Sequence, residues 1–192
     1  MPSDAWDVSE AGNGKVMAWV DPHGEMFDLY IGAEGGVWAG ESCIDMFEGY
    51  IEASKIMFGS AFHTENVRDV SDMFWNCSSL TSLNLSSFDT TMVQNMSGMF
   101  SCCDSLTNLD LSTFNTSNVT DMGWMFPFCN NLTSLDLSNF DTINVQNMAH
   151  MFYSCESLTN LELGYRFVTT NADTSFMFDI CPVGDNYQHL LH

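Results

Sequence analysis

The sequence predicts an α/β repeat solenoid, in which each coil of 26 residues contains one short helix and one short parallel strand. Three observations support this prediction. "CSSLTSLNL" recurs with small changes as "CDSLTNLDL", "CNNLTSLDL" and "CESLTNLEL". Cysteines and Met-Phe pairs recur every 26 residues without an insertion: Cys77, Cys103, Cys129, Cys155 and Cys181, and Met73, Met99, Met125, Met151 and Met177. A fixed period of about 20–50 residues is typical of coils that stack on one another.

The first half of each coil is expected to be helical. From Val67 to Cys77 the apolar residues are three or four positions apart, as they are on one face of a helix. Asp69, Asp121 and Asp173 would lie in the first turn of such helices, where a negative charge suits the helix dipole.

The second half of each coil is expected to be a strand. After the cysteine the chain reads Leu-x-x-Leu-x-Leu, and the last two leucines alternate with polar residues as in a strand with one buried face. Polar turns around Phe88, Phe114 and Phe140 then lead to the next coil. We expect a single parallel sheet with strands at Leu83–Leu85, Leu109–Leu111, Leu135–Leu137 and Leu161–Leu163.

The N-terminal segment is expected to cap the stack, because a terminal coil has no neighbour to bury its exposed side. Lys15–Val20 and Glu25–Gly32 are predicted to form a β-hairpin around a turn at Asp21–Gly24. The predicted domains are a cap (residues 1–40), a degenerate first repeat (41–65), regular repeats (66–181) and a C-terminal tail (182–192). The tail either closes the core or is disordered, and the chain is expected to be an excised or naturally short array.

Composition limits the partners that the chain can bind. Its 192 residues include 25 acidic and only 4 basic ones, which gives a net charge of −21. Direct nucleic-acid binding is not expected, since phosphate contacts need clustered Lys or Arg. The acidic surface either keeps the chain soluble or faces a basic partner. No stretch is apolar enough to span a membrane, and no signal peptide is visible.

The cysteines and histidines do not predict a metal, cofactor or catalytic site. Cysteines at one repeat position would have parallel Cβ vectors, whereas a disulfide or a zinc site needs converging ones. The five repeated cysteines are therefore expected to be buried and reduced, and Cys102 is the candidate for an exposed thiol. Cys43 lies outside the repeated column as well. No histidine is spaced to pair with a repeated nucleophile, so the chain is not expected to be an enzyme.

The segment "NVTDMGWMFPFCNNLTSLDLSNFDTINVQNMAHMF" resembles the BspA-type leucine-rich repeats of bacterial and mycoplasmal surface lipoproteins. The likeness covers about Val67 to Cys181, and "KVMAWVDPHGEMFDLYIGAEGGV" resembles the segment that precedes the first repeat in this family. The resemblance implies a recognition or adhesion module at the cell surface or outside the cell. It brings no catalytic residues.

Two columns of residues are candidate partner-binding sites. The first is a polar strip on the outer face of the predicted sheet, which solenoids commonly use for binding: Ser82, Asn84, Asn108, Asp110, Ser134, Asp136, Asn160 and Glu162. The second is an aromatic edge where the helical half turns towards the strand: Trp75, Trp124, Phe128 and Tyr153, with Ser101 and Pro127 at equivalent positions. The aromatic residues could equally cover gaps between coils.

Three functions are compatible with the sequence. The first is a surface recognition or adhesion module for a protein or glycan of unknown identity. The second is a structural subunit that self-associates into a fibre or array. The third is an acidic inhibitor that mimics nucleic acid or masks a basic protein; its binding would weaken steeply as salt rises.

Overall fold

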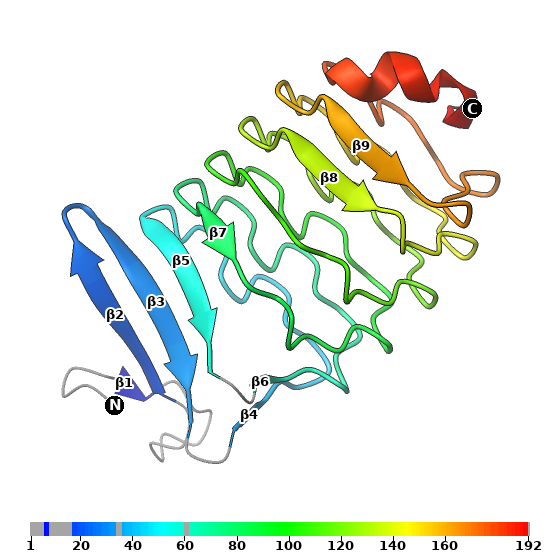
Figure 1. The fold of residues 1–192 in the computed structure, drawn as a ribbon. Coiled ribbons are helices and arrows are strands. Elements are labelled where there is room, and N and C mark those ends of the chain that lie inside the picture. Colours follow the sequence, from blue (N-terminus) through cyan, green and yellow to red (C-terminus); the bar gives the residue numbers. More distant parts are fainter. Residues whose placement is uncertain (1–5, 8–16, 34–35, 60–61, 192) are drawn as a thin grey trace.

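The computed structural model describes residues 6–7, 17–33, 36–59 and 62–191, and it is a β-solenoid whose coils stack along one axis (Figure 1). Its strands and its one helix among the described residues are β1 (Trp6–Asp7), β2 (Met17–His23), β3 (Met26–Gly32), β4 (Val37–Trp38), β5 (Ala53–Phe58), β6 (Phe62–His63), β7 (Ser82–Leu83), β8 (Ser134–Leu137), β9 (Asn160–Leu163) and the 3-10 helix η1 (Pro182–Leu190). In the described part of the chain, no helix has the length and apolar character needed to cross a membrane.

The helix predicted for each coil is wrong. Residues 70–76 and their equivalents form consecutive turns, and we call these segments the turn halves: 43–49, 70–76, 96–102, 122–128, 148–154 and 174–180. Each turn half has two residues with left-handed φ, four positions apart, for example Asp72 (φ 53) and Asn76 (φ 58). A right-handed helix cannot continue through such residues, because every residue of that helix has negative φ.

Hydrogen bonding explains what replaces the helix. Within a turn half, alternate N–H groups bond locally, as Trp75 does to the Asp72 carbonyl at 2.9 Å. The N–H groups between them bond to the next coil, as Phe74 does to Met99 at 3.0 Å. The left-handed residues orient these N–H groups along the solenoid axis. The N–H groups therefore donate to carbonyls of the neighbouring coil, and not to the carbonyl of residue i−4 as in a helix.

The bonds between coils join into four chains that run along the described stack. One chain passes from Asp45 to Ser71, from Asp72 to Ser97, from Gly98 to Gly123, from Trp124 to Ala149 and from His150 to Ser175. Every N–H in these chains points towards the C-terminal end and every carbonyl towards the N-terminal end. The peptide dipoles therefore add up along the stack, as they do in an α-helix.

The acids predicted to sit at helix starts have another role. Asp69, Asn95, Asp121, Asn147 and Asp173 occupy one column of parallel bridges. Each accepts a hydrogen bond from the backbone N–H two residues later. The Asn95 amide also donates to Asp69 at 3.2 Å and the Asn147 amide to Asp121 at 3.0 Å. Amides between the carboxylates prevent direct contact of like charges along the column.

The strand halves are parallel, but they do not form the single sheet that the sequence predicted. One sheet has the order β1-β2-β3-β5-β7 and a second contains β8 and β9. No strand forms at Leu109–Leu111, although both leucines are buried at 5% and 1% exposure. Burial of the leucines holds this coil in place without strand hydrogen bonds. The gap between the two sheets coincides with a groove on the strand face.

The hairpin at the N-terminal end is formed by β2 and β3, and β3 also pairs in parallel with β5. Its turn is at Gly24–Glu25 and not at Asp21–Gly24, because His23 pairs directly with Met26. Gly24 has φ 74, as the first position of a two-residue hairpin turn requires. Lys15 and Val16, predicted to begin the first strand, lie outside the described residues.

The core is built from identical side chains stacked between coils. Phe47, Phe74, Phe100, Phe126, Phe152 and Phe178 form one continuous ladder, with ring centroids 5.2–5.8 Å apart and planes within 8°. At the C-terminal end the tail closes this ladder, because Tyr187 of η1 stacks on Phe178 at 5.8 Å. The Tyr187 hydroxyl donates to the Leu161 carbonyl at 2.5 Å.

A column of buried threonines also connects the coils. Thr64, Thr90 and Thr116 each donate a hydrogen bond to a carbonyl 25 residues later and accept one from the N–H of the same residue. Thr142 bonds in the same two directions to Val168. These hydroxyls satisfy backbone groups that the irregular loops would otherwise leave unpaired.

The repeated cysteines lie beside the phenylalanine ladder. Each thiol from Cys77 to Cys155 donates to a phenylalanine carbonyl of the preceding coil, at 3.1–3.3 Å. All seven cysteines are free, and only Cys102 is partly exposed. Burial raises the pKa of Cys77 to about 12 and that of Cys43 and Cys181 to about 11.

We expect the thiols other than Cys102 to be inert in the native protein, because the reactive species is the thiolate. In a labelling experiment with an aromatic disulfide reagent, Cys102 should react within minutes and the other thiols only after addition of denaturant. Intact mass should show no disulfide. Rapid labelling of four or more thiols in native protein would contradict the buried column.

Candidate functional site

The polar strip on the strand face forms a groove. Side chains of β8 and β9 alternate between exposed polar residues and leucines, which are buried except for the partly buried Leu163. The parallel register places Ser134 beside Asn160 and Asp136 beside Glu162. A cavity of about 340 Å³ is lined by Asn108, Leu109, Asp110, Ser134, Leu135, Asp136, Asn160 and Glu162. We call this cavity the strand-face groove.

The groove extends towards the N-terminal coils. A second cavity of about 230 Å³ adjoins it through Asp110 and is lined also by Asn84 and Ser86. Ser82 lies in β7, exposed, at the far end of the strip, where its backbone pairs with Lys55 of β5. The structure thus brings the strip together on one face over four coils.

The carboxylates of the groove are oriented by their own turns. Hydrogen bonds from the side chain and backbone of Ser112 lower the pKa of Asp110, and those of Ser138 lower the pKa of Asp136. The N–H bonds measure 3.0 Å to Asp110 and 2.8 Å to Asp136. Both groups are therefore ionised at neutral pH and present fixed negative charge, which suits a basic ligand.

The aromatic edge is a cluster on the turn halves of the later coils. Trp124 stacks on His150 with ring centroids 3.9 Å apart, and His150 stacks on Phe176 at 5.0 Å. Phe128 meets Tyr153 edge to face at 5.5 Å. Trp124 and Phe176 remain 43% and 57% exposed. We call these five residues the aromatic cluster.

The other residues predicted for this edge do not join the cluster. Trp75 is 38% exposed, and no aromatic contact is found for it among the described residues. Ser101 and Pro127 are buried. Sequence reasoning missed His150 and Phe176, although both follow Trp124 at multiples of 26 residues and so share its place in the coil.

Ser54, His23 and Asp28 form a hydrogen-bond network that the sequence did not predict. Ser54 Oγ donates to Asp28 Oδ1 at 2.6 Å, and His23 Nε2 lies 3.0 Å from each of these oxygens. In a hydrolytic triad the two ring nitrogens contact the serine and the acid separately. Here one nitrogen contacts both, and the network instead ties β3 to β5.

We expect acid to weaken this network. Burial raises the pKa of Asp28. Hydrogen bonds from Ser54 and His23 and the charge of Lys55 lower this pKa by more than burial raises it, so the net shift is downward from 3.8. Ionised Asp28 therefore stabilises the fold above pH 3.8, and this contribution is lost as pH falls through the lower folded pKa.

The substitution Asp28→Asn should accordingly reduce the free energy of unfolding by about 1–3 kcal/mol at pH 7. The difference from wild type should shrink as the pH is lowered below 4 in urea titrations. The exposed Asp21→Asn is the matched control in the same hairpin. An effect of Asp28→Asn that is independent of pH would contradict the charge-based explanation.

The stacked coils and the polar strand face define the class: a leucine-rich-repeat-like β-solenoid. In the described ranges, no three His, Cys, Asp or Glu side chains are placed to hold a metal ion. The chain belongs to the family described as "Mycoplasma protein of unknown function, DUF285", which matches residues 41–160 and 81–186.

One solved structure is similar over almost the whole chain. It is the T. pallidum leucine-rich repeat protein, with 13% sequence identity, a TM-score of 0.45, and coverage of 93% of this chain and 94% of that one. No curated protein matches the chain.

Proposed function

We propose that the chain is a non-catalytic recognition module of a bacterial cell surface, which binds a protein partner through the strand-face groove. The observation that supports this most is the groove itself, a concave surface built from three neighbouring coils and lined by Asp110, Asp136 and Glu162. Their charges face the same opening, so a partner with Lys or Arg side chains would relieve the repulsion between them.

The proposed surface location and the finer family assignment rest on the motifs. The Met-Phe, Cys-x-x-Leu-x-x-Leu-x-Leu and Phe-Asp-Thr elements resemble those of BspA-type repeats, and membership of a mycoplasmal family is compatible with that type. Antibody labelling of intact cells, compared with permeabilised ones, tests the location. Signal only after permeabilisation would contradict it.

A glycan is the second candidate ligand, and the aromatic cluster favours it. Partly exposed aromatic rings provide large apolar contacts beside polar groups, and such residues are common in binding hot spots. The two candidates differ in where binding occurs and in salt dependence, because contacts to the groove are ionic and contacts to the cluster are not.

We expect Asp110→Asn/Asp136→Asn to weaken binding to the partner at least tenfold, because both charges that face it are removed. The measurement is biolayer interferometry with proteins and glycans purified from a cell-surface extract by retention on the immobilised chain. Trp75→Ala/Trp124→Ala is the matched control and should change affinity less than twofold.

The affinity of the wild-type chain should also fall steeply between 50 and 500 mM salt, and the double Asn variant should respond less. Loss of binding only in the tryptophan variant would transfer the function to the aromatic cluster. If neither pair changes affinity beyond twofold while the fold is intact, both surfaces are excluded.

A further inference from the structure

The last turn half has an open hydrogen-bonding edge. In every earlier coil, alternate N–H groups of the turn half donate to carbonyls of the next coil; His150, Phe152 and Ser154 do so at 2.8–2.9 Å. The corresponding N–H groups of Phe176, Phe178 and Ile180 find no acceptor among the described residues. Three of the four chains of hydrogen bonds thus end in free donors at this edge.

The alignment of the chains makes these donors stronger than isolated ones. Each of the three chains contains five bonds in the same direction before it reaches the edge. Hydrogen bonds in a chain polarise one another, and the aligned dipoles place partial positive charge on the terminal N–H groups. The edge donates without accepting, so it fits a row of oxygen acceptors.

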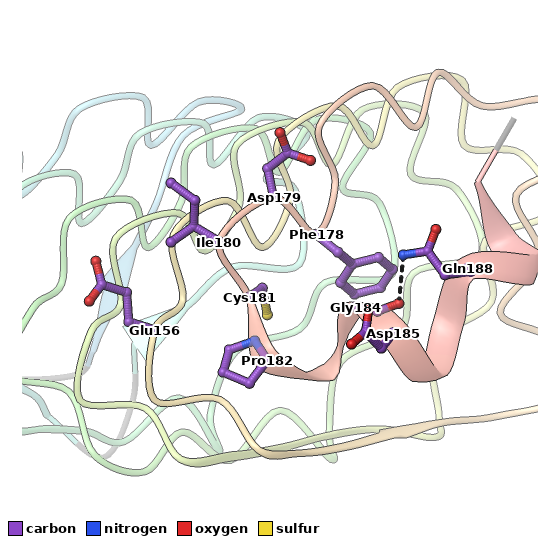
Figure 2. Close-up of a pocket in the computed structure, with 9 residues that line it drawn as sticks. All are labelled: Glu156, Phe178, Asp179, Ile180, Cys181, Pro182, Gly184, Asp185 and Gln188. Carbon is purple, nitrogen blue, oxygen red and sulfur yellow. Dashed lines mark hydrogen bonds between the residues drawn. The ribbon is translucent and has the colours of Figure 1, made fainter.

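A cavity of about 630 Å³ lies at this edge, between the last turn half and η1 (Figure 2). Phe178 and Ile180, which carry two of the free donors, line it together with Pro182. Ile180 is 62% exposed and has φ 58, an unfavourable conformation for a β-branched residue. The apolar side chains provide a contact surface beside the donors.

The rim of the cavity is acidic. Glu156, Asp179 and Asp185 contribute carboxylates from the preceding coil, the last turn half and η1 respectively, and all three are exposed (Figure 2). The described residues that line the cavity include no Lys or Arg. A segment that enters it therefore needs backbone carbonyls for the edge and positive side chains for the rim.

We propose that this edge binds an unstructured, basic segment of a partner protein, which runs along the last turn half beside η1. Its alternate carbonyls accept hydrogen bonds from Phe176, Phe178 and Ile180, and its Lys or Arg side chains pair with the acidic rim. The five junctions between the coils are internal examples of the same contact. Addition of a segment to an open backbone edge is an established mode of peptide recognition.

A second copy of the chain fits this edge less well. The first turn half does present carbonyls, at Ile44, Met46 and Glu48, that accept no backbone hydrogen bond from the residues that the structure describes. However, β3 and β2 continue the stack beyond β5 on the strand side, by about 10 Å at the usual strand spacing (Figure 1). They would meet η1 of the neighbouring copy before the two turn halves reached bonding distance.

The test uses random peptides of about 12 residues displayed on phage. They are selected on the immobilised chain after depletion on Glu156→Lys/Asp179→Lys/Asp185→Lys, whose fold is checked by circular dichroism. The selected peptides should be rich in Lys and Arg. They should lose at least tenfold in affinity for Asp179→Asn/Asp185→Asn and less than twofold for Asp110→Asn/Asp136→Asn, the control on the strand-face groove.

Amide hydrogen exchange reports on the edge directly. In the free chain, the N–H groups of Phe176, Phe178 and Ile180 should exchange at least 100-fold faster than those of His150, Phe152 and Ser154. A bound peptide should slow the first set at least tenfold. Equal protection in the free chain, peptides without excess positive charge, or binding that leaves these amides unprotected would each overturn the proposal.

The outcome is separate from that of the proposed function. Peptides that bind but are lost in Asp110→Asn/Asp136→Asn occupy the strand-face groove, which overturns the present inference and supports the proposed function. If neither Asp179→Asn/Asp185→Asn nor Asp110→Asn/Asp136→Asn weakens peptide binding, the present inference is contradicted. The strand-face groove is then tested separately, with the partner purified from the cell-surface extract.

Discussion

The substitution Phe126→Ala is expected to lower the free energy of unfolding by about 3–5 kcal/mol. Phe126 is fully buried in the middle of the phenylalanine ladder, 5.6 Å from both Phe100 and Phe152. Truncation removes two stacking contacts and leaves a cavity between coils that the fixed backbone spacing cannot close. The neighbouring coils are destabilised as well, because each coil is stabilised mainly by contacts with its two neighbours.

Urea unfolding followed by far-UV circular dichroism measures this effect, and the midpoint of thermal unfolding should fall by about 6–20 °C. Phe126→Leu, which retains most of the volume, should lose clearly less. Ile143→Ala is the surface control, since Ile143 is 55% exposed, and its effect should stay within about 0.5 kcal/mol. A loss below about 1 kcal/mol for Phe126→Ala would mean that the ladder does not hold the coils together.

The second large effect is expected for Thr116→Val, although the two side chains have nearly the same shape. Thr116 is 1% exposed, and its hydroxyl donates to the Asp141 carbonyl at 3.0 Å and accepts from the Asp141 N–H at 2.8 Å. Valine leaves both backbone groups without a partner. The expected cost is about 2–6 kcal/mol, because each of the two buried unpaired groups costs about 1–3 kcal/mol.

Thr116→Ser provides the matched control. Serine keeps the hydroxyl and removes one methyl group, so its cost should be about 1 kcal/mol. The same urea titration compares the two variants. Equal destabilisation by Val and Ser would show that the methyl group matters and that the hydrogen bonds between the coils do not.

Much of the core could be predicted from the sequence. The period of 26 residues identified the Met, Phe, Cys and Leu columns, and all of these side chains between Met73 and Leu158 are buried at 8% exposure or less. A side chain that recurs in every coil occupies the same place in the stack, so its burial follows from repetition alone. The strand strip was found in the same way, from its alternation with buried leucines.

His150 and Phe176 could have been found from the period of 26 residues, because they share the place of Trp124 in the coil and their rings stack in that order. The hydrogen-bond network of Ser54, His23 and Asp28 was not predictable, because no repeat pattern relates these three residues. Ser54 meets His23 and Asp28 through the parallel pairing of β3 with β5. Such contacts depend on the register in which neighbouring strands pair, and this register could not be predicted from the sequence.

The sequence by itself determined the stacking period, the buried columns and the alternation of the strand halves, since all three follow from where apolar side chains recur. Only the tertiary structure decided the conformation of the turn halves. Spacings of three and four suit a helix as well as a series of turns. The residues whose type favours left-handed backbone are Asp45, Gly49, Asp72, Asn76 and Gly98. Trp124 and Phe128 adopt the same φ despite their bulk, because their N–H groups then donate to the Ala149 and Tyr153 carbonyls of the next coil.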